Sequence, residues 1–351
     1  MGNRQTQLDL AQKIKDAIGL KNLQQLNLIL NSEKDSLLYT YAGVLLANES
    51  LNDEAVDCFK RAGNYGISKH LKEYLQKNGT LNSDFNVFNS SEPYDVWMLT
   101  NFLKTYRENT TKACGDYFSK NSILGKEISI LDLGTGNGYL IADIINSINS
   151  QANYSKIDLV LVDKSEEMLL KAKSYCLNNI KCKNLSITTE QIELNLKTFG
   201  KLLEQYEKIP FDIVNCALSI HHLPHEVKLP LLKFLRPISE NIVISECNWS
   251  HDIPETGSFE LIKNVSENYG CIFDDLRKSC LSEKDIECFI SGIGLPEALK
   301  ILTKPRMERI DYHTTIEHWS ELAEKADWHV SKVVPTVIYN EKTESFTMFL
   351  N

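Results

Sequence analysis

The sequence predicts an α/β fold built on a doubly wound, seven-stranded sheet that ends in an antiparallel hairpin. Three observations predict it: a glycine-rich turn that follows a buried strand at residues 128–138, an alternation of apolar strands and helices up to Glu246, and two strands at the C-terminus. Parallel strands are joined by long crossovers that are usually helices, so the alternation indicates a parallel sheet with helices on both faces.

Helical segments precede and interrupt this core. Apolar residues at helical spacing predict an N-terminal all-helical cap, and a polar linker then leads into a further helix that carries Trp97 and Phe102. A helical lid insertion is expected at residues 249–328, between strands five and six. The three expected parts are the cap, the linker with its helix, and the α/β domain: residues 1–80, 81–120 and 121–351.

Composition restricts the class of protein. The chain has 351 residues, no apolar stretch long enough to cross a membrane and no apolar signal core, so we expect a cytoplasmic protein without a membrane partner. Its nine cysteines include no C-x-x-C pair, which favours reduced thiols. The formal net charge is −9, and all of the excess acidity lies after residue 120, which argues against a nucleic-acid substrate.

The turn after the first strand carries the clearest chemical signal. Gly134, Gly136 and Gly138 allow a sharp turn and a close approach of the backbone to a ligand. The dinucleotide fingerprint G-x-G-x-x-G would place its third glycine one residue later, and here Asp132 precedes the first glycine by two residues. This acid-x-G-x-G-x-G pattern resembles motif I of class I S-adenosylmethionine-dependent methyltransferases.

The resemblance implies a Rossmann-like methyltransferase sheet and S-adenosylmethionine as the cofactor. It assigns the methionine end of the cofactor to Asp132 and to the turn that contains Gly134, Thr135, Gly136 and Gly138. The alternative is a glycine-rich turn without a ligand.

Two further strand ends are expected at the cofactor. The second strand, at residues 157–162, ends at Asp163, where an acceptor-only carboxylate suits the two ribose hydroxyls; the alternative is a surface acid or helix cap. The third strand is predicted at residues 185–188. The resemblance implies that Glu190 and Gln191, just after it, flank the adenine.

Candidate bases follow the fourth and fifth strands, which we predict at residues 211–217 and 241–245. Ligands of open α/β sheets bind at the carboxyl ends of the strands, so side chains there are candidates for proton transfer. His251 is the preferred base, Glu246 is a base or a cation anchor, and the paired histidines are bases or loop braces. The candidates are His221, His222, Glu246 and His251.

The C-terminal strands, predicted at residues 333–339 and 345–350 with a connection at 340–344, resemble the hairpin that ends class I methyltransferases. At the end of the fourth strand, Asn215 and Ala217 offer no acidic ligand, so no metal is expected.

A narrower resemblance covers residues 240–330. Residues 246–252 are similar to the EQExNHN stretch of GRAS-domain proteins, and residues 308–319 to their ERxERHExxxxW run. With an intact glycine motif, the chain resembles the bacterial GRAS-domain-like methyltransferases. This implies in-line methyl transfer to an oxygen or nitrogen of a small molecule. The alternatives are a regulatory or scaffolding protein that binds the cofactor without catalysis, and a protein or RNA methylase served by the helical cap.

Overall fold

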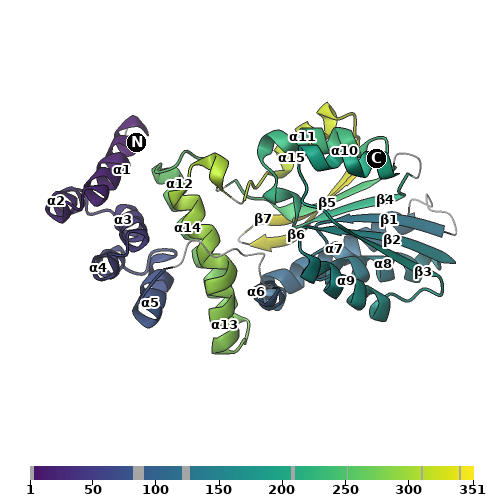
Figure 1. Ribbon diagram of the computed structural model, residues 1–351, viewed down its shortest axis with the longest axis horizontal. Coiled ribbons are helices and arrows are strands. Elements are labelled where there is room, and N and C mark those ends of the chain that lie inside the picture. Colours follow the sequence, from purple (N-terminus) through teal and green to yellow (C-terminus); the bar gives the residue numbers. More distant parts are fainter. Residues whose placement is uncertain are drawn as a thin grey trace. The chain divides into compact units, whose positions relative to one another are not determined.

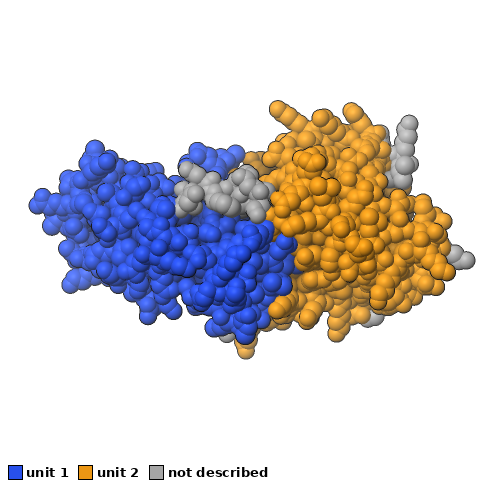
Figure 2. Space-filling view, turned by 60° about the horizontal axis from the view of Figure 1, so that its bottom comes forward, with its two compact units in different colours: residues 1–87, 92–101, 251–311 blue, residues 88–91, 102–250, 312–351 orange. Residues whose placement is uncertain are grey.

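The chain folds into two compact units that interleave along the sequence. The computed structural model describes residues 4–81, 91–120, 127–206, 210–250, 252–309, 311–339 and 341–351 (Figure 1). Residues 1–87, 92–101 and 251–311 form the helical unit, and residues 88–91, 102–250 and 312–351 form the sheet unit (Figure 2). Among the described residues, no helix has the length and apolar character needed to cross a membrane.

The sheet unit confirms the predicted fold class. Its seven strands lie in the order β3-β2-β1-β4-β5-β7-β6 (Figure 1). Strands β1 to β5 pair in parallel, whereas β7 runs antiparallel to both β5 and β6. The strands are β1 Glu127–Leu133, β2 Lys156–Asp163, β3 Leu185–Gln191, β4 Ile213–Ala217, β5 Ile242–Cys247, β6 Val330–Tyr339 and β7 Lys342–Leu350.

Both faces of this sheet are covered by helices, as its sequence pattern requires. In β1, Ile128 and Ile130 pack with the helices of one face, whereas Leu131 and Leu133 pack with those of the other. The first face holds α7 Asn101–Lys120, α8 Tyr139–Ala152 and α9 Glu166–Asn179; the second holds α10 Leu196–Tyr206, α11 His225–Leu235 and α15 Ile316–Lys325. Side chains of a strand alternate between faces, so a strand buried on both sides reads as a continuous apolar run.

The helical unit joins the N-terminal helices to most of the insertion. Helix α3 is buried almost all round, so it needs partners on more than one side, and α12 and α14 supply them. The N-terminal segment and the insertion also approach each other closely at Gly66, where a Cβ atom would lie 2.5 Å from the carbonyl oxygen of Ser266. The main helices of the helical unit are α1 Arg4–Gly19, α2 Leu23–Glu33, α3 Ser36–Asn48, α4 Asn52–Ala62, α5 Ser68–Asn78, α6 Glu92–Trp97, α12 Phe259–Lys278, α13 Glu283–Phe289 and α14 Leu295–Thr303.

These boundaries differ from those expected from the sequence. The cap and the insertion share one unit, because neither α3 nor α12 can bury its apolar residues within its own segment. The end of the insertion belongs instead to the sheet unit, since Trp319 and Leu322 of α15 pack into the core of one sheet face. The expected helix at 94–118 is two helices, α6 and α7, separated by a turn over residues 98–100.

Several strands are longer than predicted. Strand β3 continues to Gln191, and β5 continues to Cys247, so Glu246 lies within a strand rather than after it. In the final hairpin, β7 begins at Lys342, which the sequence placed in the connection. Lys342 and Tyr339 pair across a much tighter turn than expected.

Candidate functional site

The glycine-rich turn leaves the carboxyl end of β1 in a conformation that only glycine adopts readily. Gly134, Gly136 and Gly138 have φ values of 74°, 54° and 79°. The amide N–H groups of Gly134 and Thr135 donate to the carbonyl oxygen of Val162 at 2.8 and 3.0 Å. These bonds fix the turn against β2 before α8 begins at Tyr139.

Asp132 is buried beneath this turn. Its two carboxylate oxygens accept one hydrogen bond each, from the Thr135 hydroxyl at 2.6 Å and from the side-chain amide of Asn215 at 2.7 Å. Burial raises the pKa of Asp132 to about 6, although both hydrogen bonds act in the opposite direction. A cationic ligand group above the turn would stabilise the ionised carboxylate and reverse this shift.

Asp163, at the end of β2, reaches across to the same turn. One carboxylate oxygen accepts from the amide of Gly136 at 3.0 Å, and the other accepts from the amide of Ser165 at 2.9 Å. Burial raises the pKa of Asp163, and these backbone donors oppose it. Because a carboxylate oxygen accepts more than one hydrogen bond, each oxygen keeps capacity for a ligand hydroxyl.

Ser219 packs closely against the turn and, together with Asn215, offers polar atoms to a ligand. A Cβ atom at Gly134 would lie 2.3 Å from the Cβ atom of Ser219, so the close packing of the Ser219 side chain requires a glycine there. Ser219 Oγ and Asn215 Oδ1 are buried side-chain atoms without a hydrogen-bond partner in the described part of the chain. Buried polar atoms are rarely left unpaired, and a bound polar ligand would supply the missing partners.

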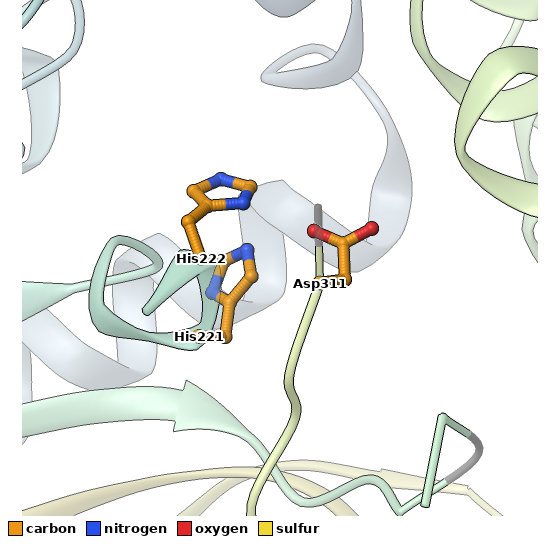
Figure 3. A group of neighbouring side chains, drawn as sticks. All are labelled: His221, His222 and Asp311. Atoms are coloured by element: carbon orange, nitrogen blue, oxygen red, sulfur yellow. The ribbon is translucent and has the colours of Figure 1, made fainter. Parts of the chain in front are cut away.

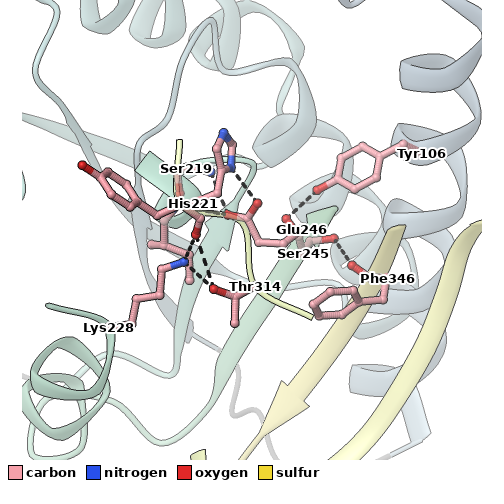
Figure 4. A network of polar contacts seen from close by, with 10 residues as sticks. Tyr106, Ser219, His221, Lys228, Ser245, Glu246, Thr314 and Phe346 are labelled. Atoms are coloured by element: carbon pink, nitrogen blue, oxygen red, sulfur yellow. Dashed lines mark hydrogen bonds and ion pairs between the residues drawn. The ribbon is translucent and has the colours of Figure 1, made fainter. Parts of the chain in front are cut away.

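Glu246 organises the loop that follows β4. Its Oε1 atom accepts from the amides of Ser219 and Ile220, both at 3.0 Å, and of His221 at 3.3 Å (Figure 4). Leu218, with a φ of 47°, turns the chain so that these three amides converge. They begin the 3-10 helix η1, Ile220–His222.

The second oxygen of Glu246 orients an imidazole. Oε2 lies 2.7 Å from Nδ1 of His221, and both side chains are buried (Figure 4). Burial by itself raises the pKa of Glu246, but His221, Lys228 and the amide of Ser219 lower it, and the net pKa lies below the usual value. An ionised Glu246 only accepts hydrogen bonds, so Nδ1 of His221 carries a proton in either charge state of the ring; in the neutral ring Nε2 would be the acceptor atom.

Aromatic rings extend from this imidazole. The rings of His221 and His222 lie 4.1 Å apart between centroids (Figure 3), and the ring of His313 stacks on His221 at 4.8 Å with an interplanar angle of 8°. Trp249 lies 5.1 Å from His313. Phe102 lies 6.1 Å from Trp249 and completes the row.

Comparison with known proteins decides the family. A family model described as a methyltransferase domain matches residues 124–327. The chain belongs to this family. It is a class I S-adenosylmethionine-dependent methyltransferase, with S-adenosylmethionine as its cofactor.

The chain is similar to solved structures, and SCL7 shares its fold. SCL7 of Oryza sativa matches with a TM-score of 0.59 and 12% identity, covering 86% of this chain and 90% of that one. A methyltransferase of Leishmania major matches with a TM-score of 0.41 and 9% identity over 79% and 89% of the two chains. A methyltransferase of Methanosarcina mazei matches with a TM-score of 0.39 and 11% identity, covering 66% of this chain and 95% of that one. The sequence matches no curated protein.

The residues expected at the cofactor of the methyltransferase fall into two groups. Asp132, Asp163 and the glycine turn come together at one sheet edge, as described above. Glu190 and Gln191 succeed each other in β3, so they project to opposite faces of the sheet. Glu190 accepts from Gln205 at 2.8 Å and from Tyr206 at 3.1 Å. Gln191 lies opposite Asp163 and donates to the carbonyl oxygen of Lys164 at 3.3 Å.

The candidate bases are distributed differently from the expectation. His251, the preferred base, lies outside the described residues. Glu246 has both oxygens committed to η1 and His221, and His222 stands beside His221 in that turn. Sequence reasoning did not single out Ser219, and it did not place His313 beside His221. Ser219 is the first polar residue after the fourth strand, one position beyond Leu218, and this could have indicated it. The contact between His313 and His221 carries no local signal, because most of the insertion separates the two residues in the sequence.

Proposed function

We propose that this methyltransferase acts on a small molecule whose oxygen or nitrogen nucleophile carries a proton, and that His221 removes that proton. The pairing of His221 with the buried, ionised Glu246 is the observation that carries the proposal. A base is needed only when the nucleophile is protonated at working pH. A nucleophile that is already anionic would not require this pair.

The pair has the geometry of an oriented general base. Glu246 fixes the ring through Nδ1, so in the neutral ring Nε2 is the atom that takes the proton of the acceptor. When bound, the cofactor would supply an electrophilic methyl group on a sulfonium, and its thioether would leave with the electron pair of the carbon–sulfur bond. Glu246, itself held by three backbone amides, then stabilises the imidazolium that His221 becomes.

The surroundings of the pair favour a small acceptor. The ring of His313 stacks on His221, and Trp249 and Phe102 continue the row of rings; rings of this kind bind small planar or apolar groups. The part of the chain after residue 120 holds 33 acidic and 24 basic residues, a balance that disfavours a polyanionic acceptor.

The proposal is tested with tritiated-methyl S-adenosylmethionine and an extract of the source cell divided into metabolite, RNA and protein fractions. We expect label in the metabolite fraction. His221→Gln should reduce the labelling by about a hundredfold or more while leaving the affinity for S-adenosylhomocysteine unchanged. His318→Gln, an exposed histidine on α15, is the matched control and should behave as the wild type.

Two outcomes would contradict the proposal. If the His221→Gln protein labelled the metabolite fraction as fully as the wild type, His221 would not be the base. Label in the RNA or protein fraction would replace the small acceptor with a macromolecule, and the helical unit would then become the natural region in which to seek its binding surface.

A further inference from the structure

We propose that Lys228 is a positioning residue for methyl transfer, which holds the segment of His313 against His221. This inference rests on the proposed role of His221 as the base. Lys228 lies on α11 and is fully buried, which is unusual for a lysine in a folded protein. Its position demands an account, because burying an ammonium group is costly unless the surroundings compensate.

The ammonium group of Lys228 donates two hydrogen bonds to one short segment of chain. Its Nζ atom donates to the carbonyl oxygen of Tyr312 and to the hydroxyl of Thr314, the latter at 2.5 Å (Figure 4). The face of the Trp319 ring lies 5.2 Å away. These contacts bracket His313, so Lys228 fixes the residues on both sides of that ring.

The same segment is connected directly to the proposed base. The amide of Tyr312 donates to the carbonyl oxygen of His221 at 2.7 Å, while the carbonyl oxygen of Tyr312 accepts from Lys228. One peptide segment therefore links the ammonium group to η1. His313 then lies parallel to the ring of His221, a geometry that leaves His221 little freedom to rotate away from Glu246.

Packing alone does not require an amino group at this place. A methionine has a similar volume and shape and would avoid the desolvation of a charge, and replacing buried charges by apolar residues is often neutral or stabilising. The methionine would leave the carbonyl oxygen of Tyr312 and the hydroxyl oxygen of Thr314 without the hydrogen bonds that Lys228 donates to them. We infer that the amino group fixes a position rather than adding stability.

The test compares Lys228→Met with Lys233→Met, an exposed lysine on the same helix. Each protein is saturated with S-adenosylhomocysteine, and the imidazole ¹⁵N and ¹H signals are recorded by NMR, with His221→Gln assigning the signals of His221. Wild type and Lys233→Met should show a single Nδ1–H tautomer for His221. In Lys228→Met this signal should broaden or divide between tautomers, while the affinity for S-adenosylhomocysteine changes less than threefold.

Methyl transfer supplies the second readout. Labelling of the metabolite fraction should fall at least tenfold in Lys228→Met and stay unchanged in Lys233→Met. Thr314→Val removes one of the two acceptors and should give a smaller loss, so the test survives if Lys228→Met does not fold. In a His313→Ala background, Lys228→Met should reduce transfer little further, because both changes remove the same constraint.

A single, sharp Nδ1–H signal and full labelling in Lys228→Met would overturn the inference. So would additive losses in the double variant, or a loss of cofactor affinity in parallel with transfer, because either would indicate a general structural role. The NMR readout does not depend on which group takes the proton, so a failure of His221 as the base is detected separately, by the activity of His221→Gln.

Discussion

Two buried carboxylates of this methyltransferase have opposite environments. Asp132 accepts from a hydroxyl and an amide side chain, and burial keeps its pKa above the usual value. Glu246 faces three backbone amides and an imidazole, and its pKa lies below the usual value even though burial acts to raise it. The first carboxylate is therefore prepared to meet a cation, whereas the second already has its partners.

The environment of Asp132 predicts a pH dependence of cofactor binding. The pKa of Asp132 is about 6 in the folded protein without ligand, against 3.8 for an ordinary aspartate. Below pH 6 the cationic amino group of the cofactor must therefore displace a proton from the Asp132 carboxyl group. Affinity for S-adenosylhomocysteine, measured by calorimetry, should therefore rise about tenfold per pH unit up to pH 6 and then level off.

The same shift affects stability. Between about pH 4 and 6 the folded chain binds more protons than the unfolded chain at Asp132, so this residue's contribution to stability falls as the pH rises. Asp132→Asn should abolish both dependences. An affinity that does not vary between pH 5 and 7 in the wild type would contradict the assignment.

Asp163→Ala tests the ribose contact. The variant should weaken S-adenosylhomocysteine binding by about 1.5–3 kcal/mol, the scale of hydrogen bonds to a charged group. Ser165→Ala is the control, because it removes the cap of α9 but keeps the amide that donates to Asp163. The control should lose about 1 kcal/mol of folding stability and no cofactor affinity. Equal dissociation constants for Asp163→Ala and wild type would exclude Asp163 from the site.

Glu246→Gln tests how the orientation of His221 is maintained. A glutamine can still accept from the amides of η1 with its oxygen, but its amide nitrogen would then donate to Nδ1 of His221. The imidazole would carry its proton on Nε2 and could no longer act as a base there. Transfer should fall about a hundredfold or more with little change in cofactor affinity. Retention of wild-type transfer rates would show that this tautomer does not matter.

At the scale of elements, the turn between β1 and α8 joins two strands and a helix. Its amides bond to β2 and its Gly138 packs against α9, where a Cβ atom would lie 2.8 Å from the Cα atom of Ala172. The turn is thus shaped by its neighbours as well as by its own glycines.

Gly136→Val should abolish detectable binding of S-adenosylhomocysteine. A β-branched residue is strained at a φ of 54°, and the shift it forces would break the hydrogen bond from the Gly136 amide to Asp163. Gly200→Val, on α10, is the control for a glycine with open space around it. Calorimetry measures the binding, and circular dichroism verifies the fold. Unchanged affinity in a folded Gly136→Val protein would disprove a role for the turn.

At the scale of the whole molecule, the helical unit depends on two distant parts of the chain. Helix α3 packs against α12 and α14, and side chains join the two parts: Tyr65 donates to Glu267 at 2.8 Å, and Arg277 pairs with Glu73 at 3.0 Å. The N-terminal helices are therefore part of the core of this unit and not a detachable addition to it.

Deletion of residues 1–80 should consequently destabilise the insertion rather than leave an intact enzyme. The apolar faces of α12 and α14 would lose their contacts with α3, and large exposed apolar patches promote aggregation. We expect increased dye binding to apolar surface and rapid proteolysis within residues 252–309. A truncated protein that resists protease and unfolds cooperatively would contradict this view.

The sequence alone predicted the sheet and the edge of it at which Asp132, Asp163 and the glycine turn come together. The patterns that predicted it are local in the sequence. They are an apolar run before Gly134, an acid at the end of β2, and a helix cap at Ser165 that the structure confirms. Each is a property of a dozen residues or fewer, which local sterics and hydrogen bonding fix.

Only the tertiary structure decided the partners of the side chains that stand at that edge. Glu246 looked like a strand end from the sequence, but β5 continues past it and directs its carboxylate beneath η1. His313 reaches His221 only because Lys228 and the pairing of Tyr312 bring a segment from beyond the insertion back to the sheet. The pairing of groups so distant in the chain depends on burial and packing of the whole fold, and no local pattern encodes it.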